Sequence, residues 1–206
     1  MDIRPFNSTQ LPLPPQKSHL LIPKNQSVEI EIGCGVGLHP VQRATLLPET
    51  FFVGIEHTKE KFQKFLRRTS NHPHLKNLHA IHANAISWIT HFVPKESVDR
   101  YWILYPNPYP KKKQQNMRWH LMPFMEKLLW TLKPGGELHL STNMQYYADE
   151  AEFYFLKHWK LEAKSKQTLH INTLSPAGVA KTHFEKKYLL RGQNCYDLVF
   201  KKPTIS

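Results

Sequence analysis

The sequence predicts an α/β domain built on a mostly parallel sheet, with helices on both faces and an antiparallel strand at its C-terminal edge. Two observations lead to this fold. From Val28 onward, short runs rich in β-branched and aromatic residues alternate with segments whose apolar residues recur at helical spacing. The last two candidate strands have no helix-length segment of good pattern between them, which favours antiparallel pairing.

Seven segments qualify as strands on these grounds. They cover residues 28–32, 51–56, 78–82, 98–105, 136–142 and 196–201, with a weaker one within 161–168. Apolar stripes predict helices over residues 58–69 and 119–132, and a third through Tyr147, Ala151, Tyr154 and His158. One more helix is expected directly after the glycine-rich turn that ends at Gly37.

Residues 1–26 are expected to form an extended N-terminal arm, because several prolines punctuate them and fix the backbone. The arm would either lie on the main body or remain loose from it. Residues 27–206 show no internal repeat and no second core, so the sequence predicts a single domain over this range.

The composition constrains the class of protein and its partners. The 206 residues carry 28 Lys and Arg against 16 Asp and Glu, a formal charge of +12, which favours a polyanionic partner. The two cysteines cannot build a disulfide scaffold, no apolar run is long enough for a bilayer, and no secretory signal is recognised. We therefore expect a cytoplasmic protein with no membrane partner.

Two reactive residue types are assigned ordinary roles. The nearest histidine pairs, His72 with His74 and His79 with His82, lack a thiolate or carboxylate set at ligand spacing. No metal site is therefore predicted. Cys34 is expected to be a small packed side chain rather than a nucleophile.

A glycine-rich turn follows the first strand and is the first candidate ligand site. It contains Gly33, Gly35 and Gly37 on alternate positions, preceded by Glu31. Glycines let the backbone turn sharply and approach a ligand without a Cβ in the way. The second strand ends at Glu56, nineteen residues after Gly37, at the same sheet edge, where a carboxylate can accept both hydroxyls of a ribose. A glycine turn without a ligand is the alternative.

The fourth strand leads into a second candidate site. Asn107 stands between two prolines, which stiffen the backbone and hold its side chain at the sheet edge. Lys111, Lys112 and Lys113 follow, and then Arg118, so four cations gather with no acid between them. Such a patch suits the phosphates of RNA, although a solvated face without a partner has the same pattern.

Together these motifs resemble the tRNA (guanine-N7-)-methyltransferase family, a group of class I S-adenosylmethionine-dependent methyltransferases. The resemblance rests on Glu-Ile-Gly-x-Gly-x-Gly at residues 31–37, Gly-Ile-Glu at 54–56, Pro-Asn-Pro-Tyr-x-Lys at 106–111, Leu-Lys-Pro-Gly-Gly at 132–136 and Thr-x-x-Glu at 182–185. It implies a Rossmann-like fold, S-adenosylmethionine as methyl donor without a metal, and tRNA as partner. It also implies transfer to guanine N7 in the variable loop by a monomer or simple homo-oligomer.

The resemblance and the motifs together give expected site residues. The cofactor site would comprise Glu31, Gly33, Gly35, Gly37, Glu56, Asn84 and Asn107. Within it the resemblance implies that Glu31 faces the methionine end, Glu56 the ribose and Asn84 the adenine. The RNA would meet Lys111, Lys112, Lys113, Arg118, Asn143, Thr182 and Glu185. Asn107 and Glu185 are the expected catalytic residues.

The chain departs from the family pattern at several of these positions. Relatives usually have aspartate at the positions of Asn107 and Asn143, and often also at the position of Asn84. Tyr109 stands where they have tryptophan. Two other functions therefore stay open. One is a methyltransferase that acts on a different acceptor, and the other is a weakly active or non-catalytic relative that binds RNA or the cofactor.

Overall fold

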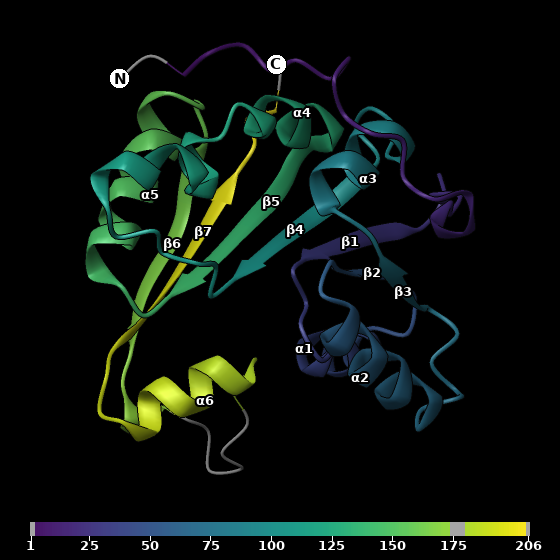
Figure 1. The fold of residues 1–206 in the computed structure, drawn as a ribbon. Coiled ribbons are helices and arrows are strands. Elements are labelled where there is room, and N and C mark those ends of the chain that lie inside the picture. Colours follow the sequence, from purple (N-terminus) through teal and green to yellow (C-terminus); the bar gives the residue numbers. More distant parts are fainter. Residues whose placement is uncertain (1–2, 174–179, 205–206) are drawn as a thin grey trace.

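The computed structural model describes residues 3–173 and 180–204 and contains one seven-stranded sheet (Figure 1). The strand order is β3-β2-β1-β4-β5-β7-β6. The strands are β1 (Ser27–Ile32), β2 (Thr50–Glu56), β3 (Leu78–His82), β4 (Val98–Leu104), β5 (Leu132–Thr142), β6 (Glu162–Leu169) and β7 (Cys195–Lys201). The first five strands pair in parallel, whereas β7 is antiparallel to both β5 and β6. The predicted mixed α/β sheet is confirmed.

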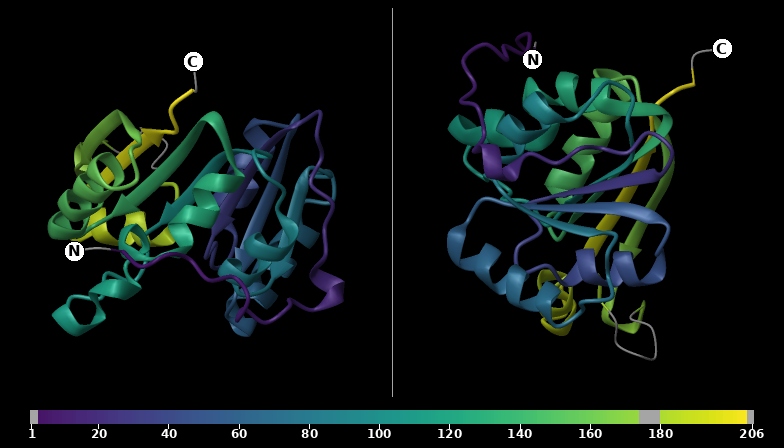
Figure 2. Two further views of the ribbon diagram at one scale, coloured as in Figure 1. Left: turned by 90° about the horizontal axis from the view of Figure 1, so that it is seen from above. Right: turned by 90° about the vertical axis from the view of Figure 1, so that its right-hand side faces the viewer.

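Helices connect the strands. The α-helices are α1 (Leu38–Leu46), α2 (Lys59–Ser70), α3 (Ala85–Phe92), α4 (Phe124–Thr131), α5 (Gln145–Lys157) and α6 (His183–Leu190). Short 3₁₀ turns occur at η1 (Gln16–Ser18), η2 (Lys112–Met117), η3 (Trp119–Leu121) and η4 (Ile171–Thr173). Figure 2 shows the twist of the sheet and the helices on its two sides.

Three expectations were wrong in detail. The helix expected over residues 119–132 is divided into η3 and α4, because Pro123 has no N–H to continue a helix and caps α4 instead. The connection between the last two strands does contain a helix, α6, which depends on a capping residue rather than an apolar stripe. The antiparallel strand β7 lies one position in from the edge, which β6 forms.

Two separate apolar layers cover the sheet. The larger lies between the sheet and helices α3, α4 and α5, and includes the fully buried Trp88 and Tyr147. On the other face, Ala44 of α1 packs with Phe52 of β2, and Phe65 of α2 is completely buried beside the glycine-rich turn. Alternate residues of each strand serve the two layers, as the pleat requires.

The N-terminal arm lies on helices α3 and α4. The indole N–H of Trp88 donates to the carbonyl of Ser18 at 2.7 Å, and the Ser87 hydroxyl donates to the carbonyl of Pro12. Phe6 packs edge-on against Phe124, with ring centroids 5.8 Å apart. The arm therefore covers the outer surface of these helices and leaves the carboxyl ends of the parallel strands open.

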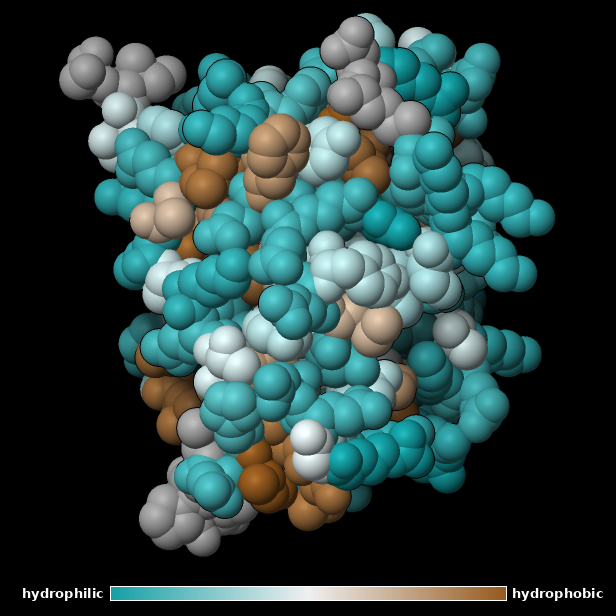
Figure 3. Space-filling view, turned by 90° about the vertical axis from the view of Figure 1, so that its left-hand side faces the viewer, coloured by the Kyte–Doolittle hydropathy of each residue, from teal (hydrophilic) through white to brown (hydrophobic). Residues whose placement is uncertain are grey.

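Over the described residues, no helix combines the length and apolar character needed to cross a membrane. The face that carries α5 and the edge strand β6 is mainly hydrophilic, with small separate apolar patches (Figure 3). Ligand sites of such sheets lie at the carboxyl ends of the parallel strands. At this edge, α6 lies below the ends of β4 and β5 (Figure 1).

Candidate active site

A cleft of about 630 Å³ opens at the carboxyl ends of β1, β2 and β4. This volume is in the range of small-molecule sites. Its walls come from the glycine-rich turn, the end of β4, the start of α2 and the helix α6. The residues around it include Glu31, Gly33, Cys34, Gly35, His39, Glu56, Lys61, Tyr105, Asn107, Trp119, Thr182, His183, Phe184 and Tyr188.

The three glycines of the turn have two different roles. All have positive φ angles, of 72°, 60° and 76° for Gly33, Gly35 and Gly37. A Cβ added to Gly33 or Gly35 would meet no atom within 4 Å, so the backbone there faces open space in the cleft. A Cβ on Gly37 would lie 2.0 Å from the Phe65 ring, so Gly37 serves helix packing and does not line the cleft.

Glu56 is held at the end of β2 by backbone donors. Its side chain is only 5% exposed. The Gly35 N–H donates to Oε2 at 2.9 Å, and the Thr58 N–H donates to Oε1 at 2.6 Å. A carboxylate has about four acceptor positions, so both oxygens can still accept from a ligand. The turn and the carboxylate therefore form one prearranged unit.

Glu31 is the second buried carboxylate of the cleft. It forms a 2.7 Å contact with Nδ1 of His39, and both side chains are almost completely buried. His39 packs edge-on against Trp102 and separates the cleft from an apolar cavity of about 490 Å³ beside α1. Sequence reasoning missed His39. The one available signal was a polar residue at the second position of a helix that had to pack on the sheet.

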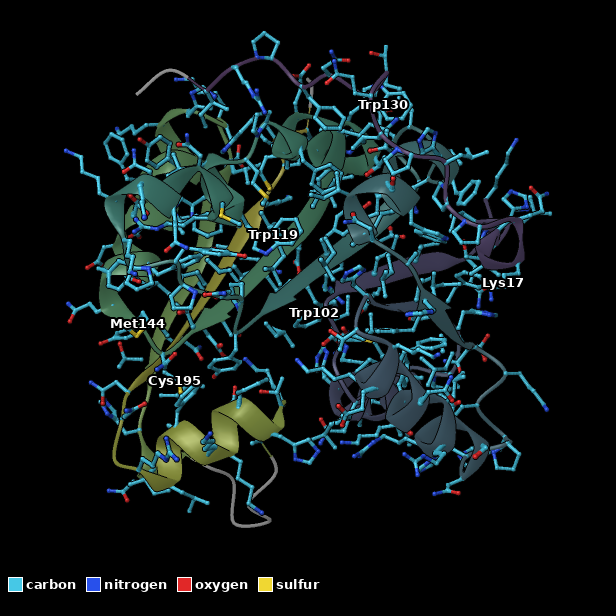
Figure 4. The ribbon with its side chains drawn as sticks, in the orientation of Figure 1. Lys17, Trp102, Trp119, Trp130, Met144 and Cys195 are labelled. Carbon is cyan, nitrogen blue, oxygen red and sulfur yellow. The ribbon has the colours of Figure 1, made fainter. Side chains whose placement is uncertain are left out.

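Cys34 is a packed thiol, in line with its expected role. Burial raises its pKa well above the usual value, and the negative charges of Glu31 and Glu56 raise it further. A thiol that stays protonated is a poor nucleophile. The second cysteine, Cys195, is also buried and lies beside α6 (Figure 4).

The segment after β4 turns sharply around Asn107. Tyr105 and Tyr109 both have positive φ angles, of 51° and 43°, on either side of the two prolines. Such angles are unusual for aromatic residues. The Asn107 side chain is exposed in the cleft, and its Oδ1 accepts from the Tyr109 N–H at 3.2 Å. This tight turn presents an amide at the cleft.

The four expected cations after Asn107 occupy two different environments. Lys111, Lys112 and Lys113, named here the lysine run, are exposed. Arg118 is 7% exposed, donates from Nε and Nη2 to the Tyr109 carbonyl, and pairs with Glu150 at 2.5 Å. Arg118 therefore fixes the turn from behind, whereas the lysine run faces solvent.

Glu185 of α6 is buried beside the cleft but is not part of its lining, and each of its two oxygens accepts one hydrogen bond within the protein. Thr182 caps the helix by accepting from the Glu185 N–H at 3.0 Å. The Tyr105 hydroxyl donates to Oε2 at 2.9 Å, and the Lys181 N–H donates to Oε1 at 2.9 Å. Burial, and next the charge of Glu185, raise the pKa of Tyr105, which keeps the phenol a donor. This contact attaches α6 to the end of β4.

Like Gly37, Glu185, Arg118 and the lysine run, the remaining two expected residues lie outside the cleft lining. Asn84 caps α3, because its Oδ1 accepts from the N–H groups of Ile86 and Ser87 at 3.0 and 3.3 Å. Asn143 follows β5 and donates to Gln193 at 3.3 Å. In residues 3–173 and 180–204, no group of three His, Cys, Asp or Glu side chains is placed to hold a metal ion.

Comparison with solved structures supports the fold. An antibiotic-related methyltransferase superposes with a TM-score of 0.65 at 16% identity, covering 87% of this chain and 90% of the other. The 16S rRNA methyltransferase KamB gives a TM-score of 0.62 at 14% identity, covering 87% and 89%. The [4+2]-cyclase SpnF matches at 0.60 and 14% identity, over 90% of this chain and 78% of its own, so this fold also hosts other chemistry.

Comparison with sequences gives the family. A family model described as "Putative methyltransferase" matches residues 25–198. A tRNA (guanine-N(7)-)-methyltransferase of Bartonella quintana is 28% identical over 92% of this chain and 81% of its own length. One of Nitrosococcus oceani is 31% identical over 84% of this chain and 70% of its own. This chain therefore belongs to the tRNA (guanine-N(7)-)-methyltransferase family of Rossmann-like methyltransferases.

Proposed function

We propose that the protein transfers a methyl group from S-adenosylmethionine to N7 of a guanine in tRNA. The observation that carries this proposal is the buried carboxylate of Glu56 beside the open backbone of Gly33 and Gly35. This unit lies at the same sheet edge as Asn107 and the lysine run. Because Glu56 and Asn107 line the same cleft and the lysine run follows Asn107 along the chain, the arrangement supports a nucleoside site next to an RNA-facing surface.

The residues present fit the adenosyl part of the donor. Gly33 and Gly35 leave space that any Cβ would fill, and Glu56 has acceptor positions for two ribose hydroxyls. Glu31, held by His39, provides a negative charge suited to the ammonium of a methionine moiety. S-adenosylmethionine supplies a methyl group that its sulfonium already activates. The chain then mainly has to hold donor and acceptor in line.

The acceptor needs little proton chemistry. Guanine N7 offers a lone pair and holds no proton, so no general base is required. Methylation leaves the ring positively charged, and nearby carboxylates would stabilise this charge. Asn107 and Asn143 can orient by hydrogen bonding but carry no charge. Glu185 is the one carboxylate among the residues expected to face the guanine.

The RNA partner is supported by the exposed cations beyond the cleft. The lysine run follows directly on the turn that presents Asn107. Its three ammonium groups suit RNA phosphates, while Tyr109 and Phe184 provide aromatic surface near the cleft for an extruded base. We propose a cytoplasmic enzyme that acts as a monomer or simple homo-oligomer.

A methylation assay tests this function directly. Purified protein is incubated with labelled S-adenosylmethionine and unmodified tRNA transcripts, and the modified nucleotide is mapped. We expect label in N7-methylguanosine in the variable loop. Label in another nucleotide would show that the acceptor is not guanine N7 of the variable loop. Donor binding without transfer to tRNA would overturn the proposed activity.

One observation favours a second candidate function, a non-catalytic or weakly active binding protein. Both oxygens of Glu185 accept hydrogen bonds within the protein. The two other positions expected to stabilise the methylated base, Asn107 and Asn143, carry amides instead of carboxylates. Calorimetry with S-adenosylmethionine, combined with the transfer assay, separates the candidates. Strong donor binding with no turnover would favour this second function.

A further inference from the structure

Helix α2 carries a row of cations on the side of the cleft away from the lysine run. We name Lys61, Lys64 and Arg67 the α2 basic face; they follow one another at a spacing of three residues, and all three are exposed. Glu60 is the one acid in this helix and pairs with Lys64 at 2.7 Å. Lys61 and Arg67 form no ion pair within the described part of the chain.

Helix stability does not account for this arrangement. Lys59 and Lys61 lie in the first turn of α2, where the helix dipole disfavours positive charge. Arg67 lies in the last turn, where the helix dipole favours a cation, so its charge stabilises the helix itself. Lys59 and Lys61 form no ion pair within the described residues although they stand at the unfavourable end of the helix, so their charge is available to an external anion.

The position of α2 connects this surface to the cleft. Lys61 itself lines the cleft, together with residues of α6 and the end of β4. The Arg68 guanidinium donates from Nε to the Val36 carbonyl at 3.0 Å, and from Nη2 to Nε2 of His183 at 3.3 Å. These contacts join α2 to the glycine-rich turn and to α6. The basic face is thus fixed at the mouth of the cleft.

We propose that the α2 basic face binds the phosphate backbone of the RNA substrate, on the opposite side of the cleft from the lysine run. This inference rests on the proposed function, because it takes tRNA as the substrate. Backbone contacts on both sides fix the register of the strand, and the target base lies between them over Asn107. Phosphate contacts of this kind position RNA without reading its sequence.

The test removes charge from α2 and, in a matched control, from the opposite edge of the sheet. The test variant is Lys61→Gln with Arg67→Gln. The control is Lys24→Gln with Lys76→Gln, two exposed lysines that precede β1 and β3 at the amino ends of these strands. Binding of a fluorescent unmodified tRNA transcript is measured by anisotropy over a range of salt concentrations. Thermal unfolding checks that both variants remain folded.

Each lost phosphate contact lowers the slope of log affinity against log salt by roughly 0.7 to 0.9. The test variant should therefore lose about 1.5 from the slope and bind about twentyfold more weakly at about 0.15 M salt. The control should keep the slope of the unmodified protein. Equal slopes for the test variant and the control would overturn the inference, as would tRNA binding that does not depend on salt.

The anisotropy experiment does not depend on turnover, so the two proposals can fail separately. If the unmodified protein forms N7-methylguanosine but the test variant binds like the control, the function stands and the α2 surface is wrong. If no methyl transfer occurs and the test variant still loses slope, the α2 surface stands and the catalytic function is wrong.

Discussion

The two halves of the cleft treat negative charge in opposite ways. In the half formed by β1, β2, α1 and α2, the carboxylates of Glu31 and Glu56 are buried and fixed by His39 and by backbone donors. In the half formed by β4, the turn after it and α6, Asn107 is an exposed amide and Glu185 is bonded to Tyr105. The half that would hold the nucleoside contains two buried carboxylates in the cleft lining, whereas the half that would hold the acceptor presents an amide to the cleft.

This difference indicates that the expected donor side of the cleft is more strictly prearranged than the expected acceptor side. A donor of fixed chemistry can be met by a prearranged set of groups, which lowers the entropy cost of binding. The acceptor half has given up charge at the positions that would face a methylated, cationic base. We therefore expect tight donor binding and slow transfer, and the first three predictions below test the two halves in turn.

The largest effect is expected at Gly37, the glycine that serves packing in the nucleoside half. Gly37→Ala places a Cβ 2.0 Å from the Phe65 ring at a φ of 76°. The free energy of unfolding should fall by about 3 kcal/mol, the sum of backbone strain and overpacking. Gly33→Ala, with open space around it, should cost only about 1 kcal/mol. Denaturant unfolding of both variants measures the difference, and equal losses would contradict the assigned roles.

Donor affinity should depend strongly on Glu56. Glu56→Gln replaces one acceptor oxygen by an NH₂ group that faces a backbone N–H of Gly35 or Thr58. The loss of charge-assisted hydrogen bonds should cost about 2 kcal/mol, or about thirtyfold in affinity for S-adenosylmethionine by calorimetry. Glu60→Gln on the exposed side of α2 is the control and should bind normally. If the Glu56→Gln variant bound S-adenosylmethionine with unchanged affinity, Glu56 would not contact the ribose.

Charge restored to the acceptor half should accelerate transfer. In the double variant Asn107→Asp with Asn143→Asp, carboxylates would stabilise the cationic product and the transition state that leads to it. We expect single-turnover methylation of tRNA to rise about tenfold, which is about 1.4 kcal/mol. Asn25→Asp with Asn116→Asp, two exposed amides outside the cleft lining, adds the same number of charges as a control. If both variants gave the same rate, the amides would not explain slow transfer.

The last prediction is a pH dependence of stability that arises at two histidines outside the cleft lining. Burial lowers the pKa of His120 to about 4, although Glu150 opposes the shift, and burial lowers the pKa of His139 to about 4 as well. A histidine whose folded pKa lies below its unfolded value destabilises the protein as pH falls from about 6.5 to 4. Each should cost about 2 kcal/mol at pH 5.

His120 tests this origin, because its Nδ1 is a buried atom without a hydrogen-bond partner. Thermal unfolding of the unmodified protein and of His120→Phe would be compared between pH 7 and pH 5. The variant should lose less stability over this range. Parallel curves for the two proteins would assign the acid sensitivity to other groups.

Much of the fold followed from the pattern of the sequence. The strands alternate or run continuously apolar, so their positions along the chain could be predicted. Their carboxyl ends gave the shared sheet edge of Glu31, Glu56 and Asn107. Helix α6 could not be found from an apolar stripe, because its eight residues depend on the Thr182 cap. The Thr-x-x-Glu spacing was the available signal, and it was interpreted as a substrate motif.

The details of the site depend on contacts distant in the sequence. A run of cations predicts a surface, but Arg118 is buried because Glu150 of α5 and the Tyr109 carbonyl receive it. The role of Gly37 depends on where Phe65 packs, and spacing among glycines does not reveal it. The expected ligand contacts of the cleft residues remain predictions.

One imidazole ring borders two neighbouring hollows of this protein. His39 lines both the cleft of about 630 Å³ and the apolar cavity of about 490 Å³ beside Trp102 and Val41. Replacing this residue by alanine would remove a side chain that the two hollows share. A nucleoside analogue with a hydrocarbon branch would then fit the engineered protein and be rejected by the natural one, a selectivity handle for chemical biology.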